Sequence, residues 1–473
     1  MYDCTGFYIN GEWRRNPGAG VHDIINPATE QPAGSVAYGT PQEVDDAVAA
    51  ARAAFDDFSA WPVRQRLDLL DQIVASYKNR WNDIAEAITA EMGAPAEFSR
   101  RSQAGSGLAH LRATMDALQT MALEQDHDGY IERLEPIGVC GLITPWNWPI
   151  NQIVCKVAPA LAAGCTMVLK PSEIAPADAT IFAEVLHEAG VPAGVFNLVH
   201  GDGPGVGSAL SGHPGIDMVS FTGSTRAGIL VAKSAADSVK RVAQELGGKS
   251  PNIILESAPL EEAVAWGAHA MFHNTGQSCN APSRMLVPAP LYEQAVEIAA
   301  SVARATRPGD PNDPASDIGP VVSARQFGRI QDLIEKGVRE GAVAAAGGPG
   351  KPEGLDTGFY VRPTVFRDVH NGMTIAREEI FGPVLCMIPY NDTDEAIRIA
   401  NDTNYGLSGY VWAGDQQEAM AVARRMRTGM VHINGADTDA RAPFGGYRQS
   451  GNGREWGDHG IREFMETKAV MPG

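Results

Sequence analysis

One cysteine lies among small and amide-bearing residues, where its thiol could carry covalent chemistry. Cys279 belongs to the stretch HNTGQSCNAPSR, which runs from His273 to Arg284. A thiol at the end of an apolar helix is usually a packed small hydrophobe. Gln277 before it and Asn280 after it give this thiol a polar flank that disfavours such packing. A packing role, a metal ligand, half of a disulfide and a nucleophile are the alternatives.

Cysteine usage argues against the disulfide and the metal ligand. Six cysteines in 473 residues are too sparse for a disulfide framework. None forms a C-x-x-C pair and no H-x-x-x-H spacing accompanies them, so no metal site is expected. The start of the chain lacks a basic stretch followed by an apolar one, which predicts no signal peptide. We therefore expect a cytoplasmic protein with free thiols.

Charge and composition exclude other classes of partner. The formal net charge of −19 predicts neither a nucleic-acid nor an anionic-membrane partner, because both would repel the chain. The least polar run, residues 158–169, is shorter than the roughly 20 residues that a membrane-spanning helix needs. With 44% hydrophobic and 20% charged residues, the composition is typical of a globular enzyme of two or three domains.

The elements that must position the thiol alternate between β-branched runs and Ala-rich amphipathic stretches. Strand and helix patterns alternate over residues 138–248 and again over residues 251–429, which predicts an α/β fold with parallel sheets. The region before residue 120 reads mostly as amphipathic helix. The Gly/Pro-rich stretch 344–358 reads as a surface loop.

Several predicted strand ends carry residues that could bind a nucleotide. Gly223 and Ser224 lie between a strand and a helix, where free N–H groups can receive a phosphate. Gly203 lies in a second glycine-rich loop, GDGPGVG, and either loop could instead be only a tight turn. Lys170 and Glu173 follow another strand and could hold ribose hydroxyls, or form a solvated ion pair.

Two further positions could support a covalent reaction. Glu245 precedes a Gly-Gly pair at a strand-to-loop junction, where it is either a base or a solvated carboxylate. Asn147 lies between two tryptophans and two prolines in TPWNWP. An amide held so firmly could stabilise an oxyanion, although an aromatic-proline packing corner is an equal alternative.

Taken together, the motifs of this chain resemble those of the aldehyde dehydrogenase superfamily. They occur in the family's order and approximate spacing: PWNWP, KPSE, FTGS, ELGGKSP, GQSCNAPSR, EEIFGPV and PFGGYRQSGNGRE. The resemblance covers nearly the whole chain, from YINGEW to METKAV. It is specific, because several independent motifs would have to coincide by chance.

The resemblance implies a fold as well as a reaction. An aldehyde dehydrogenase-like α/β fold would have a Rossmann-like NAD(P)-binding domain over 1–120 and 138–247 and an α/β catalytic domain over 248–446. A small β oligomerisation flap would use 121–137 and 447–473, with one strand near DGYIERLEPIG. The family forms homodimers or homotetramers, so we expect one of these assemblies.

The resemblance also implies catalytic roles. Cys279 looks like the family nucleophile, Glu245 like its general base and Asn147 like its oxyanion donor, which works with the Cys279 backbone N–H. Lys156 and Glu455 match a proton relay behind the base. The implied reaction is NAD(P)-dependent oxidation of an aldehyde to an acid through a thiohemiacetal and a thioester.

Cofactor contacts are implied by the same correspondence. Those at the two riboses and the pyrophosphate are Lys170, Glu173, Gly223, Ser224, Glu379 and Phe381, and the others are Thr144, Pro145, Trp146, Ser172, Gly203, Phe221, Leu246 and Gly247. The charge of Glu173 would repel a 2′-phosphate, so we expect NAD to be preferred. NADP stays possible, because Lys170 and Ser172 could accommodate that phosphate.

The implied substrate tunnel has both apolar and polar walls. It comprises Trp148, Gln152, Cys155, His273, Phe444 and the loop 434–446, which carries Thr438 and Arg441. Trp148 stands where many family members have Phe, which should narrow the tunnel. We expect a medium-sized aldehyde with an apolar body, and a polar or acidic end if the loop contacts it rather than facing solvent.

Two alternatives to a hydrolytic enzyme remain. A coenzyme A-acylating semialdehyde dehydrogenase would pass its acyl group to that acceptor, but Glu245 favours water. A catalytically inactive binding or structural protein is disfavoured by the joint presence of Cys279, Glu245 and Asn147.

Overall fold

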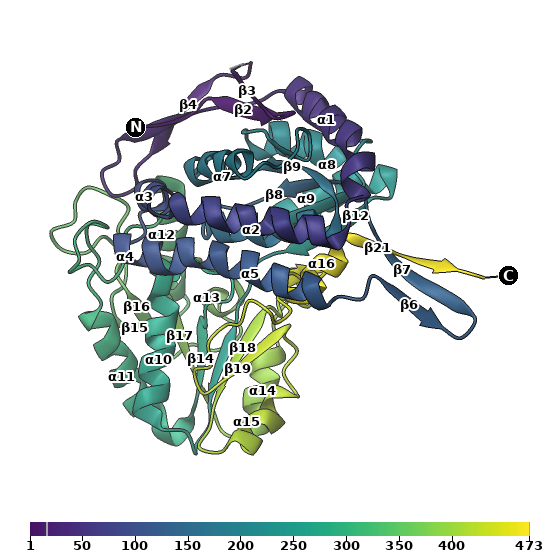
Figure 1. Cartoon of the computed structure of the whole chain (residues 1–473). Coiled ribbons are helices and arrows are strands. Elements are labelled where there is room, and N and C mark those ends of the chain that lie inside the picture. The colour runs from purple at the N-terminus through teal and green to yellow at the C-terminus, as the bar shows by residue number, and fades with distance from the viewer. Residues whose placement is uncertain (16–17, 473) are drawn as a thin grey trace.

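Two large parallel sheets, each flanked by helices, form the body of the protein (Figure 1). The structure is a computed structural model that describes residues 1–15 and 18–472. Within these residues, no helix has both the length and the apolar character needed to cross a bilayer. The alternating strand and helix patterns thus produce the predicted α/β fold class.

The first sheet has the order β20-β12-β11-β8-β9-β10-β2-β3. Its five central strands are parallel, as expected for β-α-β connections. Their bounds are β8 Val139–Ile143, β9 Thr166–Lys170, β10 Phe196–Leu198, β11 Met218–Thr222 and β12 Arg241–Glu245. The antiparallel edges are β2 Gly6–Ile9, β3 Glu12–Arg15 and β20 Gly451–Asn452.

Helices surround this sheet, and one of them is buried on every side. The surrounding helices are α1 Pro41–Ser59, α2 Val63–Asn79, α3 Trp81–Met92, α4 Ala96–Phe98, α5 Ala104–Thr120, α7 Ala177–Glu188, α8 Ser208–Gly212 and α9 Thr225–Ala235. α6 (Pro149–Ala163) is buried along its whole length, as its apolar sequence requires. It begins at Pro149 and ends at Gly164, whose φ of 93° closes the helix. Charged or polar side chains on α6 are therefore held in the interior.

The second sheet has the order β15-β16-β17-β14-β13-β18-β19. Its strands are β13 Pro251–Ile254, β14 Arg284–Pro288, β15 Val343–Ala346, β16 Thr364–Arg367, β17 Val384–Tyr390, β18 Ser408–Trp412 and β19 Met430–Ile433. All neighbours are parallel except β15 and β16. Its helices are α10 Leu260–Phe272, α11 Tyr292–Ala305, α12 Ala324–Arg339, α13 Thr374–Arg377, α14 Thr393–Asn401 and α15 Gln416–Ala423.

A third sheet projects from the body beside the C-terminus (Figure 1). It consists of β6 (Glu124–His127), β7 (Tyr130–Pro136) and β21 (Met465–Val470), and β7 pairs antiparallel with both others. The pairing predicted between DGYIERLEPIG and the end of the chain is therefore present. Of the segment 447–473, β20 instead joins the first sheet and α16 (Gly457–Glu463) packs on α5 and α6. The division into three domains stays a prediction.

The structure differs from the sequence expectations in three places. Before the first helix at Pro41, five short strands occupy residues 2–37, with β1 (Tyr2–Cys4), β5 (Pro32–Ala37) and β4 (Val21–Ile25) forming a small sheet. β15 includes the first residues of the predicted loop 344–358, because it pairs as the edge strand with β16. Cys279 does not end a helix: α10 stops at Phe272 and the thiol lies on the following loop.

Candidate active site

Loops from the two large sheets meet around the Gly-Gly pair that follows β12. The backbone N–H of Gly248 donates to Glu379 Oε1 at 2.9 Å. A Cβ added at Gly248 would lie 2.2 Å from the Cys279 carbonyl oxygen, and one added at Gly247 would lie 2.7 Å from Glu379 Oε2. Only glycine permits these approaches. The segment after Glu245 is thus in contact with both the predicted nucleophile and a predicted cofactor ligand.

The loop that carries Cys279 has an unusual backbone. Asn274, Thr275 and Gly276 all have left-handed conformations, with φ of 53°, 55° and 70°. A Cβ on Gly276 would lie 2.2 Å from the Gly382 carbonyl oxygen. The Thr275 hydroxyl donates to the Gly319 carbonyl at 3.2 Å. Backbone of this kind persists only when surrounding contacts fix it, so the nucleophile loop is held by tertiary contacts.

The TPWNWP motif is hydrogen-bonded to this loop just before Cys279. Asn147 Nδ2 donates to the Gln277 carbonyl at 2.9 Å, and the Trp148 indole N–H donates to the Ser278 hydroxyl at 2.8 Å. Asn147 is buried. The amide that the sequence predicts as an oxyanion donor therefore lies against the nucleophile loop, although 130 residues separate the two.

The electrostatic environment of Cys279 keeps its thiol protonated in the free enzyme. Burial raises the pKa of the Cys279 thiol, and the Glu379 and Glu245 carboxylates raise it further. The thiolate is the nucleophilic form. Cys279 therefore needs a proton acceptor, or a nearby positive charge, before it can attack a carbonyl.

Glu245 lies at the end of β12 with its carboxylate enclosed by protein. Its relative exposure is 3%, and neither carboxylate oxygen has a hydrogen-bonding partner among the described residues. Burial raises the pKa of Glu245 well above its usual range, the Glu455 carboxylate adds to the rise, and Lys156 and Arg454 oppose it. A carboxylate in this setting can accept a proton near neutral pH.

Lys156 and Glu455 form a buried ion pair next to this base. Lys156 Nζ contacts Glu455 Oε1, and the Cys155 thiol donates to Glu455 Oε2 at 3.4 Å. Burial alone would lower the pKa of Lys156, but the charges of Glu455, Cys155 and Glu245 and the hydrogen bond to Glu455 together outweigh it, and the net shift is upward. The two side chains that the family resemblance implies behind Glu245 are thus in contact with each other.

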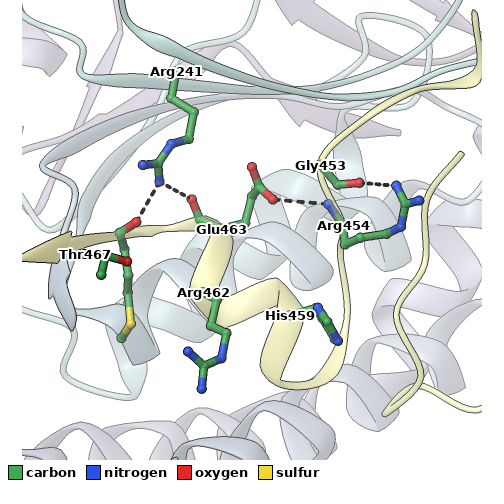
Figure 2. A pocket seen from close by; sticks show the side chains of 8 residues that line it. Arg241, Gly453, Arg454, His459, Arg462, Glu463 and Thr467 are labelled. Carbon is green, nitrogen blue, oxygen red and sulfur yellow. Dashed lines mark hydrogen bonds between the residues drawn. The ribbon is translucent and has the colours of Figure 1, made fainter. Parts of the chain in front are cut away.

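A surface hollow of about 490 Å³ lies next to β21 and α16 and is lined by Arg241 and Arg454 among others (Figure 2). The Arg241 guanidinium donates to the backbone carbonyls of Glu463 and Met465, and the Arg454 N–H donates to the Glu463 carboxylate at 3.1 Å. Arg454 lowers the pKa of Glu245 and Glu463 raises it. These contacts connect α16 and β21, near the end of the chain, to residues that shift the pKa of Glu245.

The predicted adenosine-ribose ligands are paired with each other. Lys170 Nζ donates to Glu173 Oε2 at 2.9 Å, just beyond the end of β9. The Thr144 backbone N–H donates to the Lys170 carbonyl, and the Thr144 hydroxyl is buried without a partner among the described residues. Ser172 accepts from the Ile174 N–H at 3.2 Å. Polar groups therefore gather at the carboxyl edge of the first sheet, where such folds bind nucleotides.

The predicted pyrophosphate ligands begin α9. Ser224 is the N-cap, and its hydroxyl accepts from the Ala227 N–H at 3.3 Å. Gly223 donates its N–H to the Glu245 carbonyl at 3.0 Å, which links this turn to the base. A Cβ on Gly228 would lie 2.6 Å from Leu246, so the glycine permits close packing of α9.

The remaining predicted cofactor residues occupy neighbouring elements. Trp146, which follows Pro145, packs edge-on against Phe381 at 5.4 Å, and Phe381 has a φ of 59°. Phe221 is buried in β11 near Gly223. Gly203 begins η2 (Gly203–Gly207), a glycine-rich turn capped by Asp202. These positions border the same edge of the first sheet, except Phe381, which the second sheet contributes.

The predicted tunnel residues fall into two aromatic clusters. Trp148 and His273 lie 6.2 Å apart, and Phe98 packs edge-on against both, at 5.4 and 4.5 Å. Phe444 stacks on Trp456 at 4.4 Å. Gln152 and Cys155 are buried on α6, which lies between Trp148 and Phe444 in the sequence.

The loop 434–446 carries Thr438 and Arg441, two polar residues of the predicted tunnel. Arg441 Nη2 binds Asp439 at 2.6 Å, and its side chain is 73% exposed. Thr438 is exposed. In the structure the Arg441 guanidinium is thus exposed and paired with Asp439 of its own loop, and a contact with the substrate stays a prediction.

Sequence reasoning missed several residues of the site. Phe98 completes the cluster with Trp148 and His273, Trp456 covers Phe444, and Gln103 donates to the Asn147 carbonyl at 3.2 Å. Trp456 follows Glu455 directly, so its position was a usable signal. Phe98 and Gln103 come from a helical stretch with no motif, and only the tertiary structure shows their place.

Comparisons with known proteins agree with this geometry. Residues 13–470 match the sequence model of the aldehyde dehydrogenase family. The chain is 55% identical over 472 residues, 100% of its length and 99% of the relative's, to 3-succinoylsemialdehyde-pyridine dehydrogenase of a Pseudomonas species. Among solved structures it resembles a cysteine-to-alanine variant of Pseudomonas syringae aldehyde dehydrogenase C with NAD⁺ and octanal. That match has a TM-score of 0.98 and 49% identity, and covers 99% of this chain and 96% of the other.

A second solved structure shows the same fold at lower sequence identity. The Mycobacterium tuberculosis aldehyde dehydrogenase with NAD⁺ matches with a TM-score of 0.97 and 39% identity, covering 100% of this chain and 99% of the other. The family match spans nearly the whole chain, and the relatives match it from end to end. The chain belongs to the aldehyde dehydrogenase family.

Proposed function

We propose that this protein oxidises an aldehyde to a carboxylic acid with NAD, through a thioester on Cys279 that Glu245-activated water hydrolyses. The observation that carries the proposal is the convergence of three side chains from distant parts of the sequence. Asn147 is hydrogen-bonded to the loop of Cys279, and Glu245 is close enough to raise the pKa of its thiol. Membership of the family supports the same reaction.

The first half of the reaction uses Cys279 and Asn147. The Cys279 thiol first gives its proton to water, and the resulting thiolate sulfur adds to the aldehyde carbon. The carbonyl π electrons move to oxygen to give a thiohemiacetal oxyanion. Asn147 Nδ2 and the Cys279 backbone N–H donate hydrogen bonds to that oxygen. When bound, NAD accepts the hydride that leaves the same carbon, which becomes a thioester carbonyl.

The second half uses Glu245. Its carboxylate takes a proton from water as the water oxygen adds to the thioester carbon, and the C–S bond then breaks to release the acid and the Cys279 sulfur. Lys156 and Glu455 lie where they can return the proton to solvent, because their ion pair adjoins Glu245 and contributes to its pKa. A coenzyme A-dependent enzyme would not need this base, so hydrolysis is favoured over acyl transfer.

NAD fits the residues at the edge of the first sheet. The buried Thr144 hydroxyl has no partner among the described residues, and Ser224 opens a helix at the same edge. These are groups that can bind phosphate or ribose. Two of the structural relatives are complexes with NAD⁺. Glu173 would repel a 2′-phosphate, so we expect NAD to be used in preference to NADP.

The substrate is proposed to be a medium-sized aldehyde with an apolar or aromatic body. Trp148, His273 and Phe98 form an aromatic wall, and Trp148 is hydrogen-bonded to Ser278, the residue before the nucleophile. Aromatic walls of this kind hold apolar bodies. One relative is named for a pyridine-bearing semialdehyde, and another was crystallised with octanal. Both aldehydes are larger than acetaldehyde.

Initial rates of NADH formation test this proposal without any added acyl acceptor. We expect kcat/KM to rise from acetaldehyde to octanal and to aryl-bearing aldehydes. Phe98→Ala should lower kcat/KM for the larger substrates and leave acetaldehyde unaffected. Phe327→Ala, on α12 and outside the site, is the matched control. A requirement for coenzyme A would contradict hydrolysis, and a flat response to size would contradict the proposed substrate class.

Assembly is proposed to use the projecting sheet. β6, β7 and β21 form three strands whose side chains are mostly exposed in the single chain. β6 and β21 are free sheet edges, and such edges pair readily with another strand. We therefore expect a homodimer or homotetramer, which sedimentation of the purified protein will distinguish from a monomer.

A further inference from the structure

Gln103 is a buried glutamine that contacts the active site from a distant helix. It has no exposed surface and ends η1 (Ser99–Gln103), a π-helical turn between α4 and α5. Its Nε2 group donates to the Asn147 backbone carbonyl at 3.2 Å and to Asn274 Oδ1 at 3.4 Å. The π-helical turn changes the direction of the side chains that follow it, and such turns are frequent at functional sites.

Gln103 Nε2 also approaches the Met92 sulfur at 3.6 Å, and its two oxygen acceptors belong to one connected group of amides. Asn274 Nδ2 donates to the Asn147 carbonyl at 3.0 Å and to the Gln277 carbonyl at 3.3 Å. Asn147 Nδ2 donates to the same Gln277 carbonyl at 2.9 Å. The proposed oxyanion donor Asn147 is therefore linked to the loop two residues before Cys279 through hydrogen bonds with Gln103, Asn274 and Gln277.

The backbone of that loop needs such support. Asn274 and Thr275 are consecutive non-glycine residues in the left-handed region, where a conformation survives only if its surroundings determine it. The Asn274 side chain is buried, and Gln103 is the only described donor to its Oδ1. Without Gln103, that acceptor loses its partner and the turn loses one of its restraints.

Stability alone does not explain this glutamine. Gln103 Oε1 is buried and has no hydrogen-bond partner among the described residues. An unmade bond of this kind costs stability, and an apolar side chain of similar length would avoid that cost. The donor end of Gln103 is fully used, whereas its acceptor end is not.

We propose that Gln103 is a positioning residue, which fixes the Asn147 backbone and the left-handed turn before Cys279 so that the oxyanion donor and the nucleophile keep their relative placement. The inference rests on the proposed role of Asn147 as oxyanion donor. It adds a role in positioning to a segment, α4–η1–α5, that also carries Phe98 of the proposed aromatic wall. Displacement of a reacting group by about 1 Å can lower a rate up to about 100-fold.

The test is Gln103→Met, which keeps the length of the side chain and removes its donors. We expect kcat to fall about 10-fold, less than the roughly 10²–10³-fold loss that follows removal of an oxyanion donor itself. KM for the aldehyde and Kd for NAD should be roughly unchanged. The thermal midpoint should change little, because removal of the buried unpaired Oε1 offsets the loss of the hydrogen bonds to Asn147 and Asn274. If the Gln103→Met protein does not fold, Gln103→Ala replaces it, and we expect the same fall in kcat.

Ser99→Ala is the matched control. Ser99 lies in the same π-helical turn, and its hydroxyl accepts from Thr89 at 2.8 Å and donates to the Ala94 carbonyl, with no contact to Asn147 or Asn274. We expect wild-type kcat in this variant. An equal loss in Ser99→Ala and Gln103→Met would overturn the proposal, because it would assign the effect to the turn as a whole.

A double-mutant cycle with Asn147→Ala separates positioning from an independent role. If Gln103 acts through Asn147, the double variant is no slower than Asn147→Ala alone. Losses that multiply would overturn the proposal. Wild-type kcat in Gln103→Met, with a slow Asn147→Ala, would overturn this inference alone. Wild-type kcat in Asn147→Ala would overturn the oxyanion role and this inference together.

Discussion

The cofactor side and the catalytic side of the site differ in how their charges are satisfied. At the cofactor side, Lys170 pairs with Glu173, and Glu379 accepts from the Gly248 N–H. At the catalytic side, Glu245 has no hydrogen-bonding partner among the described residues, and burial raises its pKa well above the usual range. Burial likewise raises the pKa of Cys279.

The contrast shows what each side is built to do. Ligand-binding groups that are already paired can exchange partners when a ligand arrives, at little cost in folding free energy. An unpaired buried carboxylate costs stability, and it is kept where its proton affinity is needed. On the catalytic side, Lys156 and Glu455 form an ion pair that borders Glu245. Glu455 raises the pKa of Glu245, and Lys156 lowers it.

The largest expected effect is at the nucleophile. Cys279→Ala removes the sulfur that forms both covalent intermediates, so aldehyde oxidation should fall more than about 100-fold, a small part of the roughly 10⁶-fold or greater acceleration of a typical enzyme. Because the cofactor side keeps its own contacts, NAD binding should persist, as measured by fluorescence titration. Cys386→Ala, in the buried strand β17, is the control for loss of a thiol. Turnover above about a hundredth of wild type in Cys279→Ala would contradict the covalent mechanism.

The next effect tests the charge pair behind the base. A general base works when deprotonated, so kcat rises with pH through the pKa of Glu245. Glu455 raises that pKa and Lys156 lowers it. Glu455→Gln should therefore move the rising limb of the kcat profile to lower pH, and Lys156→Met should move it to higher pH, each by roughly one unit.

The opposite signs of these two shifts make the test specific. Glu335 forms an exposed ion pair with Arg339 on α12. Glu335→Gln is therefore the control, and it should leave the rising limb of the kcat profile at its wild-type pH. Shifts in the same direction for both variants would show that the ion pair acts only by supporting the fold.

The smallest effect is at the cofactor side. Glu173→Gln keeps the hydrogen-bonding atoms near Lys170 and removes the negative charge, so the ratio of kcat/KM for NAD to that for NADP should fall roughly five- to tenfold. Glu97→Gln, whose carboxylate is exposed on α4, is the control. An unchanged ratio in Glu173→Gln would remove this residue from cofactor choice, and a wild-type preference for NADP would show that Lys170 outweighs it.

Much of the fold could be predicted from sequence, because its central strands are continuous apolar runs. β8, β9 and β11 are buried on both faces, so no alternation obscures them, and glycine or proline marks their ends. The short strands before Pro41 could not be separated in this way. β2 pairs with its neighbour β3 and joins the first sheet through β10, nearly two hundred residues later, and no local pattern records that second pairing.

The residues of the site likewise fall into those that a motif marks and those that only the tertiary structure reveals. Cys279, Glu245 and Asn147 could be proposed from motifs, although only the resemblance to a family gave them roles. Gln103 and Phe98 carry no motif, and their contribution depends on a π-helical turn that tertiary packing determines. The charge of Arg441 allowed either a substrate contact or a position in solvent, and its exposed pair with Asp439 shows where the side chain lies in the free chain.

The most direct test of the central claim is the time course of NADH formation in Glu245→Gln, mixed rapidly with aldehyde and NAD. If Glu245 activates the water that hydrolyses the thioester, one NADH per active site should form in a burst. Steady turnover should then be at least about 100-fold slower than in wild type. Steady-state turnover at the wild-type rate would contradict the account. A trace with neither burst nor turnover would also contradict it, because Glu245 would then be required to activate Cys279 rather than to hydrolyse its thioester.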